Sequence, residues 1–203
     1  RRTPTKLINH TREYIYDIQK YDKNFSYPLF KDFIFSLYTQ FQELRGEKKL
    51  DLLSQYFSED LIAKYNRHET LTNVEGVVIG NCQLQHLQIN TEFITLQIFF
   101  TANYTEVYKD GKTQRFSLRE SWKLKKSVKV ASKPPEKIQV ISCPNCGAPI
   151  TETTQGKCFS CGQSNRNGSF DWYIYEISTM KDFYVEARNS NTLLAENIVE
   201  EGT

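Results

Sequence analysis

Four cysteines form two Cys-x-x-Cys pairs in the last third of the chain, and this is its clearest chemical signal. The pairs are Cys143–Cys146 and Cys158–Cys161, eleven residues apart, with a glycine directly after each pair. Such turns free backbone N–H groups to point at the thiolates, and four thiolates at this spacing can surround Zn²⁺ tetrahedrally. Because a four-sulfur site leaves no open position for water or substrate, we predict structural zinc at all four cysteines.

A fifth cysteine, Cys82, stands alone in a strand-like segment and is expected to be a small core residue. Four cysteines at metal spacing plus one odd thiol indicate a reducing compartment, with two disulfides in an exported protein as the alternative. The sequence contains neither a signal peptide nor the ~20 apolar residues of a membrane span. The chain starts at Arg1 without a methionine, so we expect a processed or trimmed product of a longer protein.

Size and composition predict a packed protein with one main domain and a small satellite. The 203 residues are 39% hydrophobic and 13% aromatic, which argues against disorder. The net charge of +2 is too small to indicate nucleic acid by itself. Its distribution is uneven, however, since residues 109–137 hold ten basic and three acidic side chains, and the segment after Met180 is acidic.

Helical periodicity dominates the first third of the sequence. Residues 5–21 predict an amphipathic helix whose apolar stripe consists of Leu7, Ile8, Tyr14, Ile15, Ile18 and Tyr21. Ser26 is a plausible N-cap, with Pro28 in the first turn, for a long core helix that ends at Gly46. A third helix is predicted over Leu50 to Phe57, and Ser58 caps a short helix over residues 59–66.

From Val74 onward the apolar period changes to two, which predicts strands. Residues 74–89 form the first strand, with a bulge between Leu84 and Leu87, and residues 93–108 form the second. Asp110-Gly111 predicts a hairpin turn into a third strand. That strand places Phe116, Leu118, Trp122 and Leu124 on one face, and Arg115, Arg119, Lys123 and Lys125 on the other. A zinc ribbon over about 138–163 then precedes a last strand over 170–177.

Helices followed by long antiparallel strands predict an α+β fold, with the helices on the concave face of a bent sheet. The result is a cone with an apolar interior, into which the ribbon is inserted between the last two strands. We divide the chain into an N-terminal amphipathic helix (1–24), the cone domain (25–132 and 168–180), the ribbon (133–167) and an acidic C-terminal tail (181–203).

Three segments together resemble a known family. They are Phe25-Ser26-Tyr27-Pro28-Leu29-Phe30, Tyr56-Phe57-Ser58-Glu59-Asp60-Leu61 and Arg119-Glu120-Ser121-Trp122-Lys123-Leu124. In this order they resemble the Tim-forty-four-like domain, found at the C-terminus of the mitochondrial import-motor anchor and in bacterial membrane-tethered relatives. The resemblance covers roughly residues 5–130 and 170–178. It implies the cone fold of the nuclear transport factor two superfamily and a non-enzymatic tether or scaffold at a membrane face. The four-cysteine ribbon, which the mitochondrial domain lacks, favours a bacterial relative.

Other residues with chemical potential have simpler structural interpretations. Glu120 shares the apolar phase of its strand, so it is either a general base with a raised pKa or a buried carboxylate satisfied by a neighbouring polar group. The three histidines, His10, His68 and His86, are solitary and lack ligand spacing. We therefore predict no catalytic triad and no enzyme, with the Glu120 cone-pocket enzyme kept as an alternative.

The basic residues leave three interpretations open. Lys123, Lys125, Lys126, Lys129 and Lys133 are expected to bind nucleic acid, face anionic lipid headgroups, or form an ordinary solvated strand face. The basic first helix suits docking to a lipid or partner, or packing onto the cone. We predict a non-catalytic scaffold at the cytoplasmic face of a membrane, tethered by a segment outside this chain, that binds a protein or lipid partner. A nucleic-acid-binding zinc ribbon is the other alternative, and the sequence predicts no oligomeric state.

Overall fold

The structure is a computed structural model that describes residues 9–133, 142–150, 156–184 and 195–199. Its helical elements are α1 (Thr11–Gln19), α2 (Tyr27–Glu47), η1 (Leu50–Leu53), α3 (Glu59–Tyr65) and η3 (Arg166–Gly168). Its strands are β1 (Leu71–Ile89), β2 (Phe93–Tyr108), β3 (Thr113–Ser127), β4 (Tyr173–Tyr184) and β5 (Ala195–Val199).

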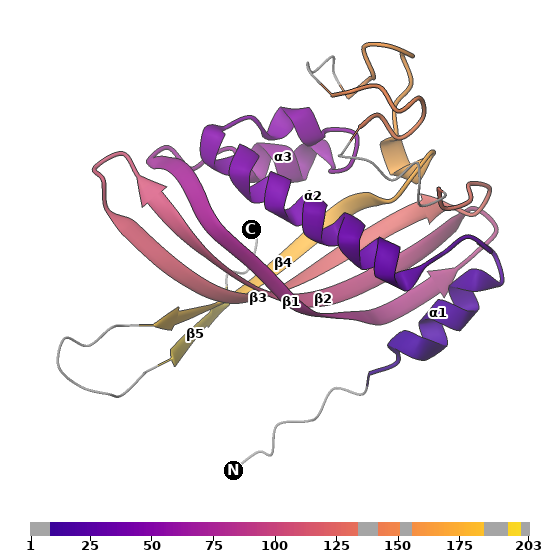
Figure 1. The fold of residues 1–203 in the computed structure, drawn as a ribbon, viewed down its shortest axis with the longest axis horizontal. Helices are drawn as coiled ribbons and strands as arrows, with labels where there is room; N and C mark the ends of the chain where they lie inside the picture. The colour runs from indigo at the N-terminus through magenta and orange to yellow at the C-terminus, as the bar shows by residue number, and fades with distance from the viewer. Residues whose placement is uncertain (1–8, 134–141, 151–155, 185–194, 200–203) are drawn as a thin grey trace.

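The five strands form one antiparallel sheet in the order β1-β2-β3-β4-β5, which confirms the α+β class. The sheet is strongly curved, and α2 and α3 lie across its concave side (Figure 1). Aromatic rings fill the space between them. The Trp122 ring centroid lies 5.3 Å from both Phe57 and Phe100, and 5.8 Å from Tyr38. The space between these helices and the concave side of the sheet is therefore filled at its centre by packed side chains.

Both predicted helix caps are confirmed. The Ser26 hydroxyl accepts from the Leu29 amide at 3.5 Å, and the Ser58 hydroxyl accepts from the Leu61 amide at 3.4 Å. Gly46, however, does not end α2, which continues to Glu47 and ends with Lys48 in the left-handed conformation. A Cβ on Gly46 would lie 2.9 Å from the Asn73 Cα, so this glycine permits the close approach of β1.

Two helix predictions need correction. The segment after η1 is not helical, because Phe57 pairs with Ile174 in a parallel bridge, and the Ile174 amide donates to the Tyr56 carbonyl at 2.7 Å. In α1, Ile18 is buried as predicted, but Tyr21 is 58% exposed. The helix ends at Gln19 before a turn, which takes Tyr21 off the stripe. The predicted stripe residues Leu7 and Ile8 lie outside the described residues.

The sequence predicted which strand residues face the core more accurately than it predicted where the strands begin and end. β3 buries Phe116, Leu118, Trp122 and Leu124 as predicted, and the expected bulge appears as a register shift between Leu84 and His86. Strand β1 begins at Leu71, three residues earlier than predicted, and β4 runs on to Tyr184. Strand β5, which pairs with β4, was not predicted at all. The cysteine-bearing segment lies between β3 and β4, and its predicted residues 138–141 and 151–155 fall outside the described ranges.

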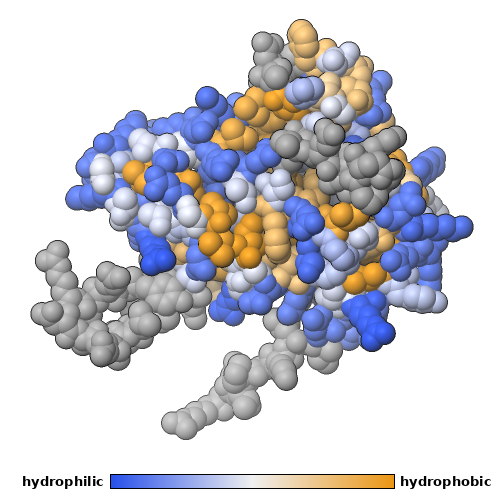
Figure 2. Space-filling model, in the orientation of Figure 1, coloured by the Kyte–Doolittle hydropathy of each residue, from blue (hydrophilic) through white to orange (hydrophobic). Residues whose placement is uncertain are grey.

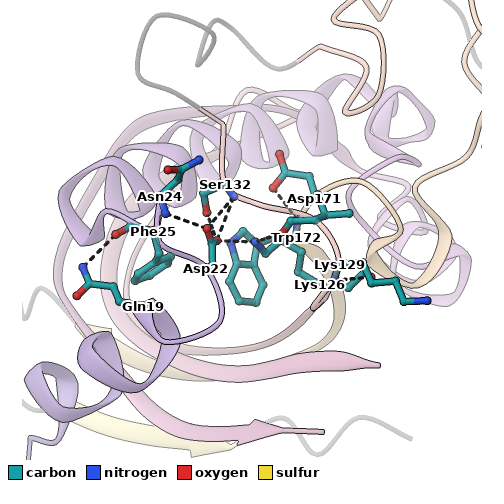
Figure 3. Close-up of polar contacts among 11 residues, drawn as sticks. Gln19, Asp22, Asn24, Phe25, Lys126, Lys129, Ser132, Asp171 and Trp172 are labelled. Atoms are coloured by element: carbon teal, nitrogen blue, oxygen red, sulfur yellow. Dashed lines mark hydrogen bonds and ion pairs between the residues drawn. The ribbon is translucent and has the colours of Figure 1, made fainter. Parts of the chain in front are cut away.

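Lys126 is not a surface lysine, contrary to its predicted place in the basic run. Its Nζ lies 2.7 Å from an Asp22 carboxylate oxygen, and the two side chains are only 1% and 2% exposed. Asp22 also accepts from the Ser132 amide at 3.0 Å, and Lys126 donates to the Val130 carbonyl at 2.8 Å (Figure 3). Lys126 follows Trp122 and Leu124 in the inward phase of β3, so its ammonium is buried and needs this partner.

Across the parts of the chain that the structure describes, no helix is both long and apolar enough to cross a bilayer.

Candidate metal centre

The four predicted cysteine ligands converge on one point. The Sγ atoms of Cys143, Cys146, Cys158 and Cys161 all lie within 4.8 Å of one another. Cys143 and Cys161 are 3.8 Å apart at Sγ, and Cys146 and Cys158 are 3.7 Å apart. With metal–sulfur bonds of about 2.3 Å, a tetrahedral site separates its sulfurs by about 3.8 Å, so this arrangement fits a tetrahedral metal ion.

The two Cys-x-x-Cys turns have the same backbone hydrogen bonds. The Gly147 amide donates to the Cys143 carbonyl at 2.9 Å, and the Gly162 amide donates to the Cys158 carbonyl at 2.8 Å. Both glycines have positive φ, +76° and +70°, a conformation in which a side chain would be strained. The glycine after each pair is thus what closes the turn and brings both sulfurs to the same side.

The thiols differ in environment. Burial raises the pKa of the Cys143 thiol to about 12, whereas the Gln163 amide and the Asn145 side chain lower the pKa of Cys161 to about 7. Asn145 Nδ2 lies 3.6 Å from the Cys161 Sγ. The site therefore contains hydrogen-bond donors that stabilise the thiolate form of cysteine, which is the form that binds a metal cation. Burial opposes this ionisation at Cys143.

The predicted alternative of two disulfides is not what the structure contains. All four cysteines are free thiols, with sulfurs 3.7–3.8 Å apart instead of the ~2.05 Å of a disulfide. The fifth, Cys82, is also free and packs half-buried against the core, as predicted. Burial raises the pKa of its thiol to about 11, which favours the protonated thiol at neutral pH.

Polar contacts dock the ribbon onto the body of the protein. The Asn165 amide donates to the Gln55 Oε1 at 2.8 Å, and the Asn165 side chain donates to the Gln55 carbonyl at 2.9 Å. The Tyr56 hydroxyl donates to the Ser142 carbonyl, one residue before the first ligand, at 2.7 Å. In Figure 1 the ribbon projects from the same side of the molecule as α2 and α3. The cysteine-bearing segment is thus held, before its first ligand and after its last, against Tyr56 and Gln55, which follow η1 in the chain.

One large apolar side chain of the ribbon is left outside. Phe159, between the last two cysteines, is 75% exposed, the highest value among the large hydrophobic residues that the structure describes. Figure 2 shows hydrophobic residues on the projecting ribbon, and further hydrophobic areas over the body of the molecule.

Glu120 lies on the inner face of β3, as its phase predicted, and is buried. It accepts a hydrogen bond from the Trp122 indole at 3.0 Å, so a neighbouring polar group does satisfy it. It also lines a pocket of about 340 Å³ at one end of the sheet. Its burial beside a polar partner is thus confirmed, whereas its role as a general base stays a prediction.

The structure does not bring the histidines together. His10 contacts Glu13 at 3.1 Å, His68 stacks on Tyr108 with ring centroids 5.8 Å apart, and His86 is exposed on β1. In the described part of the chain, the one cluster with metal-ligand geometry is that of the four cysteines.

Three of the five lysines considered for nucleic acid or lipid carry acidic partners. Besides Lys126, the Nζ of Lys123 lies 3.2 Å from Glu176, and that of Lys133 lies 3.9 Å from Asp171. Lys125 lies over the rings of Phe93 and Tyr175. Three of these five lysines are therefore paired with a carboxylate, and a fourth is stacked on aromatic rings.

Sequence reasoning missed three buried polar groups that shape the molecule. They are the Asp22–Lys126 pair, the Arg45–Glu106 pair and Asn165. The inward phase of Lys126 on β3, and the position of Arg45 four residues after the core residue Phe41, were the available signals.

No protein-family model matches the chain, and no curated protein matches it either.

Proposed function

We propose that the protein is a non-catalytic binding module in which a structural zinc ion fixes the ribbon as a docking surface for a protein partner. The exposure of Phe159 is the observation that carries this proposal. Two metal ligands, Cys158 and Cys161, flank Phe159 and fix the backbone of this turn. Little conformational entropy is therefore lost when a partner covers the phenyl ring. Burying a phenylalanine contributes about 2–3 kcal/mol, which suits the anchor of an interface.

Zinc, among the metals, is supported by the ligand set. Four thiolates in tetrahedral arrangement favour Zn²⁺ or iron over the hard ions Mg²⁺ and Ca²⁺. A closed four-sulfur site has no position for substrate, so the metal has a structural role. The purified protein is expected to contain one zinc per chain by mass spectrometry, and iron in its place would contradict this assignment.

A photo-crosslinking experiment tests the docking surface. Benzoylphenylalanine in place of Phe159 is expected to capture one protein partner in cell extract, and to lose it in the Cys161→Ser background. Val78, 62% exposed on β1, is the matched control position for the same label. Equal capture at both positions, or capture that survives loss of the metal ligand, would contradict the proposal.

The module is further proposed to work at the cytoplasmic face of a membrane, tethered by a segment outside this chain. Two aromatic residues of the α1 region support this, because Tyr16 and Tyr21 are 65% and 58% exposed. The Lys20 Nζ lies 4.7 Å from the Tyr16 ring centroid, and exposed tyrosine beside lysine is typical of a membrane interface. The family resemblance points the same way and stays a prediction.

Liposome flotation tests the membrane contact. Flotation with anionic vesicles at low salt is expected, decreasing as salt rises and lost in Tyr16→Ala/Tyr21→Ala, while Val78→Ala floats like the wild type. If the wild type does not float at low salt, the described domain does not bind lipid, and that part of the proposal fails.

A second candidate is a cone-pocket enzyme with Glu120 as general base, which the pocket beside this carboxylate favours. It requires that Glu120→Gln abolish a turnover while the unfolding midpoint stays unchanged. A nucleic-acid-binding ribbon is not proposed, because most of the lysines that would carry it are paired or stacked.

A further inference from the structure

A buried arginine lines the 340 Å³ pocket at the end of the sheet, away from the cysteines. Arg45, from the last turn of α2, is only 7% exposed. Its Nη1 lies 3.1 Å from the Glu106 carboxylate, and its Nε donates to Gln42 at 2.8 Å. Its Nη2 is buried and has no hydrogen-bond partner among the described residues. An unsatisfied guanidinium N–H is costly, so this nitrogen favours any acceptor that reaches it.

The charges around this arginine are already balanced. Glu106 compensates Arg45 and also accepts from the Tyr108 hydroxyl at 2.8 Å. Among the other lining residues, Lys64 and Glu120 add one positive and one negative formal charge. An anion entering the pocket would meet the carboxylates of Glu106 and Glu120, and a cation would meet Arg45 and Lys64. The free-energy cost of moving from water into the pocket is therefore smallest for a neutral ligand.

Aromatic residues supply much of the remaining wall. Tyr104 and Phe116 pack with ring centroids 5.5 Å apart, and His68 stacks on Tyr108. The Arg45 guanidinium carbon lies 5.4 Å from the Tyr104 ring centroid. Faces of this kind accommodate flat rings, and the carboxylates offer acceptors for an N–H donor.

We propose that this pocket binds a small, neutral, planar ligand with an amide-like edge. Its carbonyl oxygen accepts from the Nη2 of Arg45, its N–H group donates to Glu120, and its ring packs against Tyr104 and Phe116. The site is independent of the metal centre and of the ribbon. It makes the protein a small-molecule binder in addition to a docking module.

Three fragments of one shape test the ligand class. Benzamide is neutral, benzoate is its anionic analogue and benzamidine its cationic one. Binding is followed by amide NMR shifts in the zinc-loaded full chain. Benzamide is expected to shift the amides of Tyr104, Glu106 and Phe116 with a Kd on the order of 1 mM, typical of a fragment. Benzoate and benzamidine are expected to bind about tenfold more weakly, because each adds a net charge to a pocket whose formal charges already balance.

Two variants assign the contacts. Arg45→Lys keeps the charge opposite Glu106 but removes Nη2, and is expected to weaken benzamide about tenfold, as for a lost charged hydrogen bond. Glu120→Gln keeps the shape of the side chain and is expected to reverse part of the discrimination against benzoate. If Arg45→Lys does not fold, the Glu120→Gln selectivity alone decides. Arg166→Lys, at an exposed site in the ribbon and outside this pocket, is the matched control and should not change fragment binding.

The proposal is overturned if benzamide shifts no pocket amide at 20-fold above the expected Kd. It is also overturned if the three fragments bind equally, since charge then plays no part. Unchanged benzamide affinity in a folded Arg45→Lys protein would show that Nη2 does not contact the ligand, and would refute the proposed binding mode.

Discussion

Replacing Lys126 by methionine tests whether the Asp22–Lys126 pair holds the body of the protein together. Both side chains are almost completely buried, with Nζ 2.7 Å from the carboxylate. Removing one partner of such a pair leaves the other charge buried and uncompensated, which typically costs about 3–5 kcal/mol. Methionine matches the length of the lysine chain, so the change removes charge with little change in volume.

The remaining contacts of Asp22 place the expected cost at the lower end of that range. Asp22 still accepts from the Ser132 amide and hydroxyl, and from the Asn24 amide at 3.2 Å. These donors continue to stabilise the carboxylate, whereas the Val130 carbonyl loses its lysine donor. We therefore expect Lys126→Met to lower the free energy of unfolding by about 3 kcal/mol.

Urea unfolding, followed by tryptophan fluorescence, measures this loss. Trp172 is a suitable probe because its ring centroid lies 5.5 Å from the Lys126 Nζ. Lys129→Met is the matched control, since Lys129 is exposed in the next turn, and should change the free energy by less than about 0.5 kcal/mol. The double variant Asp22→Asn/Lys126→Met should lose less than the sum of the single variants, by about 2 kcal/mol.

The same pair predicts a pH dependence. Burial by itself raises the pKa of Asp22, but hydrogen bonds from Lys126 and Ser132 outweigh it and lower the pKa below its ordinary 3.8. The folded state then holds this proton less tightly than the unfolded chain. The stabilisation from Asp22 is complete well above pH 3.8 and is lost as the pH falls through the lowered pKa. The gap in stability between wild type and Asp22→Asn should therefore shrink below about pH 4.

Two results would refute this reasoning. One is a Lys126→Met protein within 1 kcal/mol of Lys129→Met, which would mean that the pair is solvated or replaceable. The other is a wild-type to Asp22→Asn gap that stays constant down to pH 3, which would mean that the folded carboxyl has an ordinary pKa.

Three shorter predictions concern the metal, one glycine and one acid. Cys161→Ser is expected to lose the bound metal, measured per chain by mass spectrometry, and full retention would contradict four-sulfur ligation. Gly46→Ala is expected to lower the free energy of unfolding, measured in urea, by about 1–2 kcal/mol, because the new Cβ would overlap the Asn73 backbone. This overlap costs more than the ~1 kcal/mol that alanine gains in helix propensity. A net increase in stability would contradict the close packing of α2 on β1. Burial raises the pKa of Asp171, so its charge is unfavourable at neutral pH; this cost begins to fall as the pH drops through the raised pKa and vanishes below the ordinary 3.8. Asp171→Asn should thus be up to about 1 kcal/mol more stable than the wild type at pH 7, and equal to it in acid; clear destabilisation at pH 7 would contradict this.

The features that the sequence predicted well are those set by neighbours along the chain. A serine followed by an apolar period caps a helix, and both Ser26 and Ser58 do so. Alternation along β3 gave the buried phase of Trp122 and Glu120, since side chains of a strand alternate between faces. The glycines after each cysteine pair close turns for a local steric reason. No long-range information was needed for any of these.

The features that it missed depend on contacts between distant segments. Lys126 has the inward phase, but its partner Asp22 lies 104 residues away, and a cluster of lysines looked like a surface. The segment after η1 leaves its helical pattern because Phe57 pairs with Ile174, which only the folded sheet brings near. Residues 195–199 join the sheet because β4 offers a free edge, although they lie within the segment that was predicted to be an acidic tail.

The way the ribbon is attached determines what the metal can control. The chain leaves the body at Ser132, which binds Asp22, and returns through Asn165, which binds Gln55. Both attachments use side chains of the body and need no metal ligand. A zinc ion would therefore order the turns between these points and contribute little to the aromatic core. Metal loss should consequently release Phe159 from its fixed position while the sheet stays folded, so the metal would govern what the protein docks to and leave its fold intact.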